Sequence, residues 1–174
     1  MIEDSEARGV RKENAEGSSD PTQEKAESLR TNAVLRDLER EGLIKKLPFD
    51  RKKIDGAMAL AHRDAKTSRA VLANDHDWAY TIAYNAILQA GRALMFAHGY
   101  RPDGANQHIS VVKFAELYLE GKDAIVFDRM RRKRHSSVYD TAGAISATEA
   151  EFAVGQAGLL IDRIEALLKN FQME

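Results

Sequence analysis

One run of 21 residues limits the fold of this chain more than any other part of its sequence. Residues 77–97, DWAYTIAYNAILQAGRALMFA, have the spacing of a helix that is apolar on nearly every side. The run contains six alanines and Gly91, so its surface is formed largely by small residues. A helix of this kind is buried on most sides and must pack against other helices or a second subunit. We therefore expect a helical bundle with this helix at its centre.

Helical spacing continues before and after this run, while strand patterns are almost absent. The expected helices cover 26–41, about 50–72, 77–97, 108–119, 123–139 and a last segment that begins at residue 146. Ser146 and Glu149 form a capping box at the start of that last helix. Residues 100–107 are expected to form a loop, and the strand-like run 124–127 is too short to form a sheet. The expected fold class is all-α, an up-and-down helical bundle of four to five main helices.

The N-terminal residues differ from the rest of the chain in composition. The first thirty contain eight acidic and five basic residues, and their only large aliphatic residues are Ile2, Val10 and Leu29. Such a segment cannot bury enough apolar surface to offset the entropy lost on ordering. We expect a disordered tail over 1–25, an N-terminal helix and linker over 26–47, and the bundle over 48–172.

Composition and missing motifs exclude several classes of protein. With 26 basic and 27 acidic residues and no cysteine, the 174-residue chain has no bulk attraction to nucleic acid and no thiolate chemistry. It lacks an apolar run of membrane-spanning length and an apolar N-terminal stretch, which indicates a soluble, cytoplasmic protein with no membrane partner. Phosphate loops and nucleophile elbows are absent. The five histidines lie at least ten residues apart, so no metal or other cofactor is expected.

The densest cluster of chemically useful residues lies between residues 129 and 140. Five of the seven residues from 129 to 135 are basic. In a helix, Arg131, His135 and Tyr139 would share one face, with Arg132 beside them. Arginine can grip a phosphate through two N–H groups, tyrosine can stack on a base, and histidine can transfer a proton. The cluster is typical of an RNA site, although a solvated helix face or a contact to an acidic partner would have the same composition.

The central run and the segment that follows it resemble the HEPN family of small helical proteins from prokaryotic toxin–antitoxin and defence systems. The run 77–95 resembles the alanine- and tyrosine-rich second core helix of that family, which ends here in Arg92-Ala93-Leu94. Gly99 and His108 match the glycine turn and the histidine that follow it. Residues 127–140 resemble the family's motif helix, and the whole resemblance covers about 43–170.

The resemblance implies a bundle that dimerises, with two motif helices facing each other across a polar cleft. Active relatives are metal-independent ribonucleases whose motif is an Arg, usually followed by Asn, with a His four to six residues further on. Two registers match this motif in part. Aligned on Arg134, the chain has His135 in place of Asn and Tyr139 in the His position. The spacing from Arg129 to His135 also fits, but Met130 then replaces the polar residue.

Three functional hypotheses follow. The first is a HEPN-like RNA-binding protein and ribonuclease, the toxin-like component of a pair with a minimal nucleotidyltransferase. Its catalytic residues would be Arg134, His135 and Tyr139. The residues that bind RNA or phosphate would be Arg129, Arg131 and Arg132. The alternative is a noncatalytic module that binds nucleotide, RNA or an acidic protein partner, in which Tyr139 would be a site of modification by AMP transfer. The third is a structural helical dimer.

Overall fold

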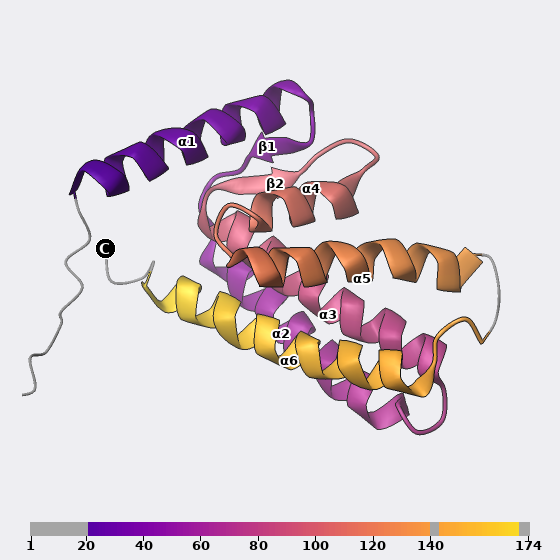
Figure 1. The fold of residues 1–174 in the computed structure, drawn as a ribbon. Helices are drawn as coiled ribbons and strands as arrows, with labels where there is room; N and C mark the ends of the chain where they lie inside the picture. Colours follow the sequence, from indigo (N-terminus) through magenta and orange to yellow (C-terminus); the bar gives the residue numbers. More distant parts are fainter. Residues whose placement is uncertain (1–20, 140–142, 171–174) are drawn as a thin grey trace, which may run out of the picture.

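The computed structural model describes residues 21–139 and 143–170, except the side chains of Glu24, residues 135–139 and Asn170. It confirms the predicted all-α helical bundle (Figure 1). The described elements are α1 (Pro21–Arg40), β1 (Ile44–Lys46), α2 (Arg51–Val71), α3 (His76–Ala97), β2 (Tyr100–Pro102), α4 (Gln107–Ala115), α5 (Gly121–Tyr139) and α6 (Ala147–Asn170). Within these residues no helix combines the length and apolar character needed to cross a bilayer.

Helix α3 is the centre of the bundle, as its composition predicts. It packs against α2, α4, α5 and α6, and Figure 1 shows it enclosed by these helices. Its alanines at 79, 83, 86, 90 and 93 are fully buried in the core, which also contains the large side chains of Ile87 and Leu94. The helices of the same chain therefore account for the burial of α3, and its small residues need no second subunit to cover them.

Gly91 allows α3 to approach α4 and α5 closely. A Cβ atom at this position would lie 2.5 Å from Cγ1 of Val111 in α4 and 3.4 Å from Cε1 of Phe127 in α5. Carbon atoms normally pack at about 3.5–4.0 Å. The absence of a side chain at residue 91 thus fixes how near the two helices can come to α3.

A small antiparallel sheet forms where the sequence predicts irregular structure. Strands β1 and β2 pair Ile44 with Pro102 and Lys46 with Tyr100, so the loop predicted over 100–107 is wrong for its first three residues. Each strand has only three residues, too few for an alternating pattern to show in the sequence. Gly99, with φ of +75°, turns the chain out of α3, and its carbonyl accepts a hydrogen bond from Leu47 N at 2.8 Å.

The N-terminal segment differs from expectation in two ways. Helix α1 begins at Pro21, so residues 21–25, expected in the tail, are helical; proline fits the first turn because its missing N–H has no partner there. Residues 1–20 lie outside the described part of the chain. Leu35, Leu38 and Ile44 join the common core, so residues 26–47 are packed on the bundle.

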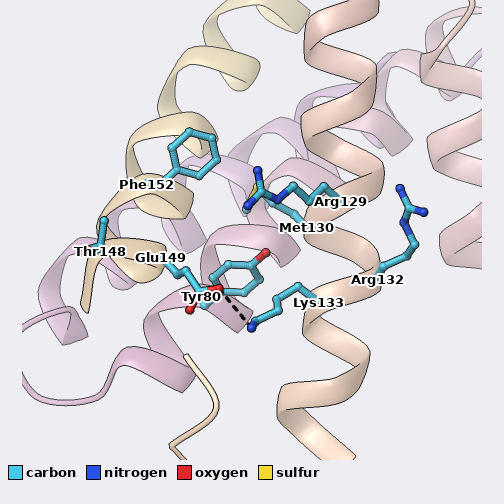
Figure 2. Close-up of a pocket in the computed structure, with 8 residues that line it drawn as sticks. All are labelled: Tyr80, Arg129, Met130, Arg132, Lys133, Thr148, Glu149 and Phe152. Atoms are coloured by element: carbon cyan, nitrogen blue, oxygen red, sulfur yellow. Dashed lines mark ion pairs between the residues drawn. The ribbon is translucent and has the colours of Figure 1, made fainter. Parts of the chain in front are cut away.

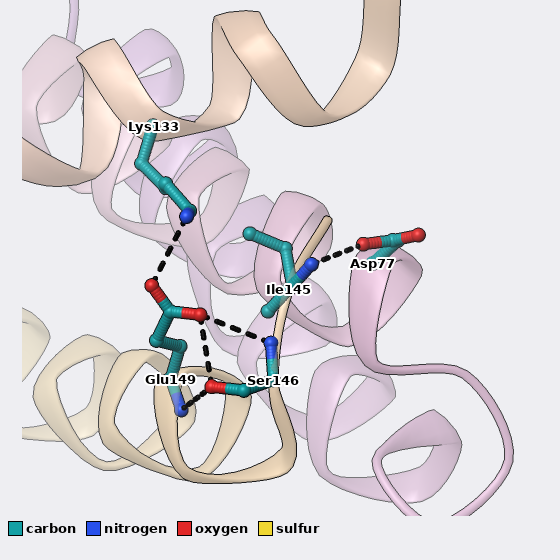
Figure 3. A network of polar contacts seen from close by, with 5 residues as sticks. All are labelled: Asp77, Lys133, Ile145, Ser146 and Glu149. Carbon is teal, nitrogen blue, oxygen red and sulfur yellow. Dashed lines mark hydrogen bonds and ion pairs between the residues drawn. The ribbon is translucent and has the colours of Figure 1, made fainter. Parts of the chain in front are cut away.

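Side chains cap the N-terminal ends of α2, α3 and α6. Asp50 accepts from Lys52 N at the start of α2, and Asp75 accepts from Trp78 N at the start of α3. The predicted capping box is confirmed: Glu149 accepts from Ser146 N at 3.0 Å, and Glu149 N donates to Ser146 Oγ at 3.3 Å (Figure 3). Asp77 accepts from the backbone N–H of Gly143 and, at 2.9 Å, of Ile145, which ties the segment before α6 to α3.

Candidate functional site

Helix α5 carries the basic residues that the sequence singled out, and it is helical as predicted through Tyr139. Phe127 and Met130 are buried and turn one face of α5 toward the core. Because Phe127 and Met130 fix which face of α5 points inward, the basic side chains of this helix separate into two groups. Arg131 and Arg134 lie near α3 and α4, whereas Arg129 and Lys133 face α6. The sequence-predicted cluster is therefore two adjacent cationic surfaces.

The first surface surrounds a histidine–tyrosine pair. Tyr84, from the buried face of α3, places its hydroxyl 2.9 Å from Nδ1 of His108, at the start of α4. The two rings stack with centroids 5.7 Å apart and an interplanar angle of 27°. Phe127 packs beside Tyr84 at 6.1 Å between centroids. The pair therefore joins α3 to α4 directly beside α5. We call Tyr84, Arg92, His108, Arg131 and Arg134 the His108 cluster.

Three arginines of this cluster influence the pKa values of both His108 and Tyr84. Burial lowers the pKa of the His108 imidazole, and the positive charges of Arg134, Arg92 and Arg131 lower it further. Burial raises the pKa of the Tyr84 hydroxyl, and the same arginines oppose that rise. At neutral pH the imidazole is neutral and the phenol is protonated.

One carboxylate partly balances these charges. Asp128 accepts from Arg131 Nε at 2.8 Å and pairs with Arg132 Nη2 at 3.0 Å. Arg92 donates to the neutral amide of Gln107 at 3.2 Å. Among the described residues, the His108 cluster thus combines three guanidinium groups with the carboxylate of Asp128, a neutral imidazole and a phenol. An anion such as a phosphate would be held there by bidentate hydrogen bonds and by charge.

The second surface is a groove of about 610 Å³ between α5 and α6 (Figure 2). Its lining residues are Tyr80, Arg129, Met130, Arg132, Lys133, Thr148, Glu149 and Phe152. In Figure 2, Tyr80 lies between the side chains of the two helices, Arg129 extends toward α6, and Arg132 points away from it. Burial raises the pKa of Tyr80 to about 12, while nearby Arg129 lowers it and Glu149 raises it.

An ion pair closes one end of this groove. Lys133 Nζ lies 3.1 Å from Glu149 Oε1, and the same carboxylate completes the capping box of α6 (Figure 3). Hydrogen bonds from the Ser146 backbone and side chain, and then from Lys133, lower the pKa of Glu149 to about 2. Glu149 is therefore a carboxylate at neutral pH.

The structure assigns the sequence-predicted residues to different places. Arg131 and Arg134 meet at the His108 cluster, while Arg129 and Arg132 line the groove. The side chains of His135 and Tyr139 lie outside the described residues, so their catalytic and modification roles stay predictions. Within the described residues, no three His, Asp or Glu side chains lie close enough together to hold a metal ion.

Sequence reasoning missed Tyr84 and gave His108 no role in the site. Tyr84 is 24 residues from His108, and no local pattern predicts that they pair. A signal did exist: Tyr80 and Tyr84 are one helical turn apart on α3, and α5 packs on that helix with Arg129 near the first and Arg134 near the second.

Comparison with known proteins supports the fold and names no activity. No protein-family model matches the chain, and no curated protein matches it. Among solved structures, the fold is similar to that of the protein TT1696 from Thermus thermophilus, with a TM-score of 0.51 and 20% identity. The match covers 66% of this chain and 97% of that one. A likeness at this identity shows the helical fold alone, and the HEPN resemblance stays a prediction.

Proposed function

We propose that this protein is a HEPN-like RNA-binding protein and that the His108 cluster holds the RNA backbone. The observation that carries the proposal is the convergence of Arg92, Arg131 and Arg134 on the His108–Tyr84 pair. Three neighbouring guanidinium groups favour a phosphate ligand, and the neighbouring rings offer stacking and hydrogen-bonding surfaces for a nucleotide. RNA binding also agrees with the basic sequence of α5, which supplies two of the three arginines.

Binding of a labelled 12-nucleotide single-stranded RNA, followed by fluorescence anisotropy, tests this proposal. Arg134→Ala should weaken binding. It should also make the slope of log K against the logarithm of the salt concentration shallower by about 0.7, as expected for the loss of one phosphate contact. Arg36→Ala, which removes an exposed arginine from α1, is the matched control and should bind as the wild type does. Equal affinities and slopes for the two variants would contradict the proposal.

A second candidate function is metal-independent cleavage of the bound RNA. The observation that favours it is the neutral imidazole of His108 beside arginines that can hold a phosphodiester. When Nδ1–H donates to Tyr84, the other ring nitrogen, Nε2, can accept a proton from a ribose hydroxyl. His108 then supplies the base that Tyr139 cannot supply in the Arg134 register. His135 remains the sequence-predicted alternative.

Cleavage assays on His108→Ala and His135→Ala distinguish these assignments. If His108 is the base, His108→Ala binds RNA but does not cleave it, and His135→Ala cleaves normally. The reverse result assigns the base to His135. RNA binding without cleavage by the wild type would support the noncatalytic module instead.

The proposed partners follow from the family resemblance. We propose a cytoplasmic homodimer that works with a minimal nucleotidyltransferase, which would modify Tyr139. Light scattering tests the dimer, and a monomer at tens of micromolar would exclude it. Mass spectrometry of the protein co-expressed with a minimal nucleotidyltransferase should detect added AMP on Tyr139, and an unmodified tyrosine would contradict this role.

A further inference from the structure

The groove between α5 and α6 has the properties of a small-ligand site that is separate from the His108 cluster. Its volume of about 610 Å³ lies within the range of roughly 300–1,000 Å³ usual for such sites. The buried side chains of Tyr80 and Met130 form its apolar base. The side chains of Arg129 and Lys133 on α5 face Thr148, Glu149 and Phe152 on α6 (Figure 2).

Two polar groups in this groove have no partner among the described residues. Only 4% of Tyr80 is exposed, and its hydroxyl makes no hydrogen bond with the described part of the chain, but this oxygen is not fully buried and opens to the groove. Arg129 is exposed and forms no ion pair with any described carboxylate. A hydroxyl at the base of a groove favours a ligand that can take its hydrogen bond, because a ligand without such a group would leave it unsatisfied.

The described lining of the groove has more positive than negative side chains, which favours an anionic ligand. Lys133 is paired with Glu149, and Arg132 shares the single charge of Asp128 with Arg131. Arg129 is then the cation whose charge is not compensated by any described residue of the groove. A phosphodiester carries one negative charge and accepts two hydrogen bonds from a guanidinium group.

Phe152 adds an aromatic surface beside this cation. Its side chain is 44% exposed on α6, and Figure 2 shows Arg129 extending toward the helix that carries it. Exposed aromatic rings beside cationic side chains are the usual platforms for the bases of single-stranded nucleic acids, because every base offers a flat face for stacking.

We propose that the α5–α6 groove binds one nucleotide, with its base stacked on Phe152, its phosphate on Arg129 and a polar atom on the Tyr80 hydroxyl. The inference rests on the proposed function in one respect, since it takes the nucleotide to be part of a bound RNA. Helix α5 would then contact one strand on both sides. Arg131 and Arg134 would hold the backbone, and the groove would hold a base.

Two probes separate a nucleotide within RNA from a free nucleotide. Calorimetric titration of the wild type, Phe152→Ala and Arg134→Ala with AMP, with adenosine and inorganic phosphate for comparison, separates binding in the groove from binding at the His108 cluster. Anisotropy with the 12-nucleotide RNA measures the whole surface. Phe152→Ala should weaken RNA binding about tenfold, as expected for the loss of one stacked base, and Arg129→Ala should weaken it and reduce its salt dependence. The matched controls are Phe49→Ala, which removes an exposed aromatic from the loop before α2, and Arg36→Ala.

The outcomes separate this inference from the proposed function. Weaker RNA binding by Phe152→Ala supports the groove, whether or not AMP binds by itself. AMP binding that depends on Phe152, in a protein that binds no RNA, supports a free-nucleotide site and overturns the RNA proposal. If Arg134→Ala weakens RNA binding while Phe152→Ala and Arg129→Ala bind RNA and AMP as their controls do, the groove inference is overturned and the RNA proposal stands. Circular dichroism and urea unfolding confirm that each variant is folded.

Discussion

Gly91 gives the sharpest stability test of the packing that positions the His108 cluster. An alanine Cβ at this position would lie 2.5 Å from Val111 Cγ1, well inside normal carbon contact. Val111 is fully buried and β-branched, so it cannot move away easily. Overpacking of this kind costs about 1–3 kcal/mol, whereas replacing a helical glycine by alanine otherwise gains about 1 kcal/mol.

Gly56 supplies the matched control within α2. A Cβ there meets nothing within 4 Å, so Gly56→Ala should show the helix-propensity gain alone. The free energy of unfolding of Gly91→Ala should therefore lie about 1–3 kcal/mol below that of Gly56→Ala. For a chain of this length, each 1 kcal/mol corresponds to a change in Tm of roughly 2–4 °C. Urea unfolding followed by circular dichroism at 222 nm measures the difference.

A double-mutant cycle identifies the contact responsible. Val111→Ala removes the Cγ1 atom that an alanine at residue 91 would strike, so it should cost less stability in the Gly91→Ala background than in the wild type. Independent effects of the two substitutions, or a Gly91→Ala variant as stable as Gly56→Ala, would refute the proposed close approach of α3 and α4.

Three further predictions concern other parts of the molecule. Burial lowers the pKa of His98 to about 4, so the folded protein disfavours protonation of this ring. The free energy of unfolding should therefore not depend on His98 above about pH 6.5 and should fall by about 2–3 kcal/mol as the pH drops toward 4. Urea unfolding at a series of pH values should show this decline in the wild type and not in His98→Phe. Asp77→Ala should lower the free energy of unfolding by about 1–3 kcal/mol, because the backbone N–H groups of Gly143 and Ile145 lose a charged acceptor; no change would show that these bonds do not hold the segment. Deleting residues 1–25 should leave Tm nearly unchanged in calorimetry, since the described side chains within 21–25 are exposed, and a fall of more than a few degrees would contradict this.

The sequence predicts most of the helical architecture because helical burial follows a local rule. The period of 3.6 residues identifies the central helix 77–97, and the Ser146–Glu149 capping box marks the start of α6 within one residue. The two strands could not be predicted, since each has three residues and is defined by a partner more than fifty positions away.

The candidate site is predictable in composition but not in arrangement. Charge density alone identifies Arg129, Arg131 and Arg134. Their division between two surfaces depends on which face of α5 packs inward, and Phe127 and Met130 decide that only in the folded bundle. The His108–Tyr84 pair depends on the angle between α3 and α4, which no short motif encodes.

The most direct test of the account is an NMR titration of the His108 ring with and without RNA. In the free protein, burial and the charges of Arg134, Arg92 and Arg131 lower the pKa of His108 below its ordinary value of 6.5. A phosphate bound among these arginines would offset their charge, so RNA should raise the midpoint of the His108 titration. Arg134→Ala removes one of the charges and should raise this midpoint in the absence of RNA. The ring signals of His62, which lies between α2 and α6 beside Glu165, serve as the control. A His108 midpoint that RNA and Arg134→Ala both leave unchanged would contradict a phosphate site at this cluster.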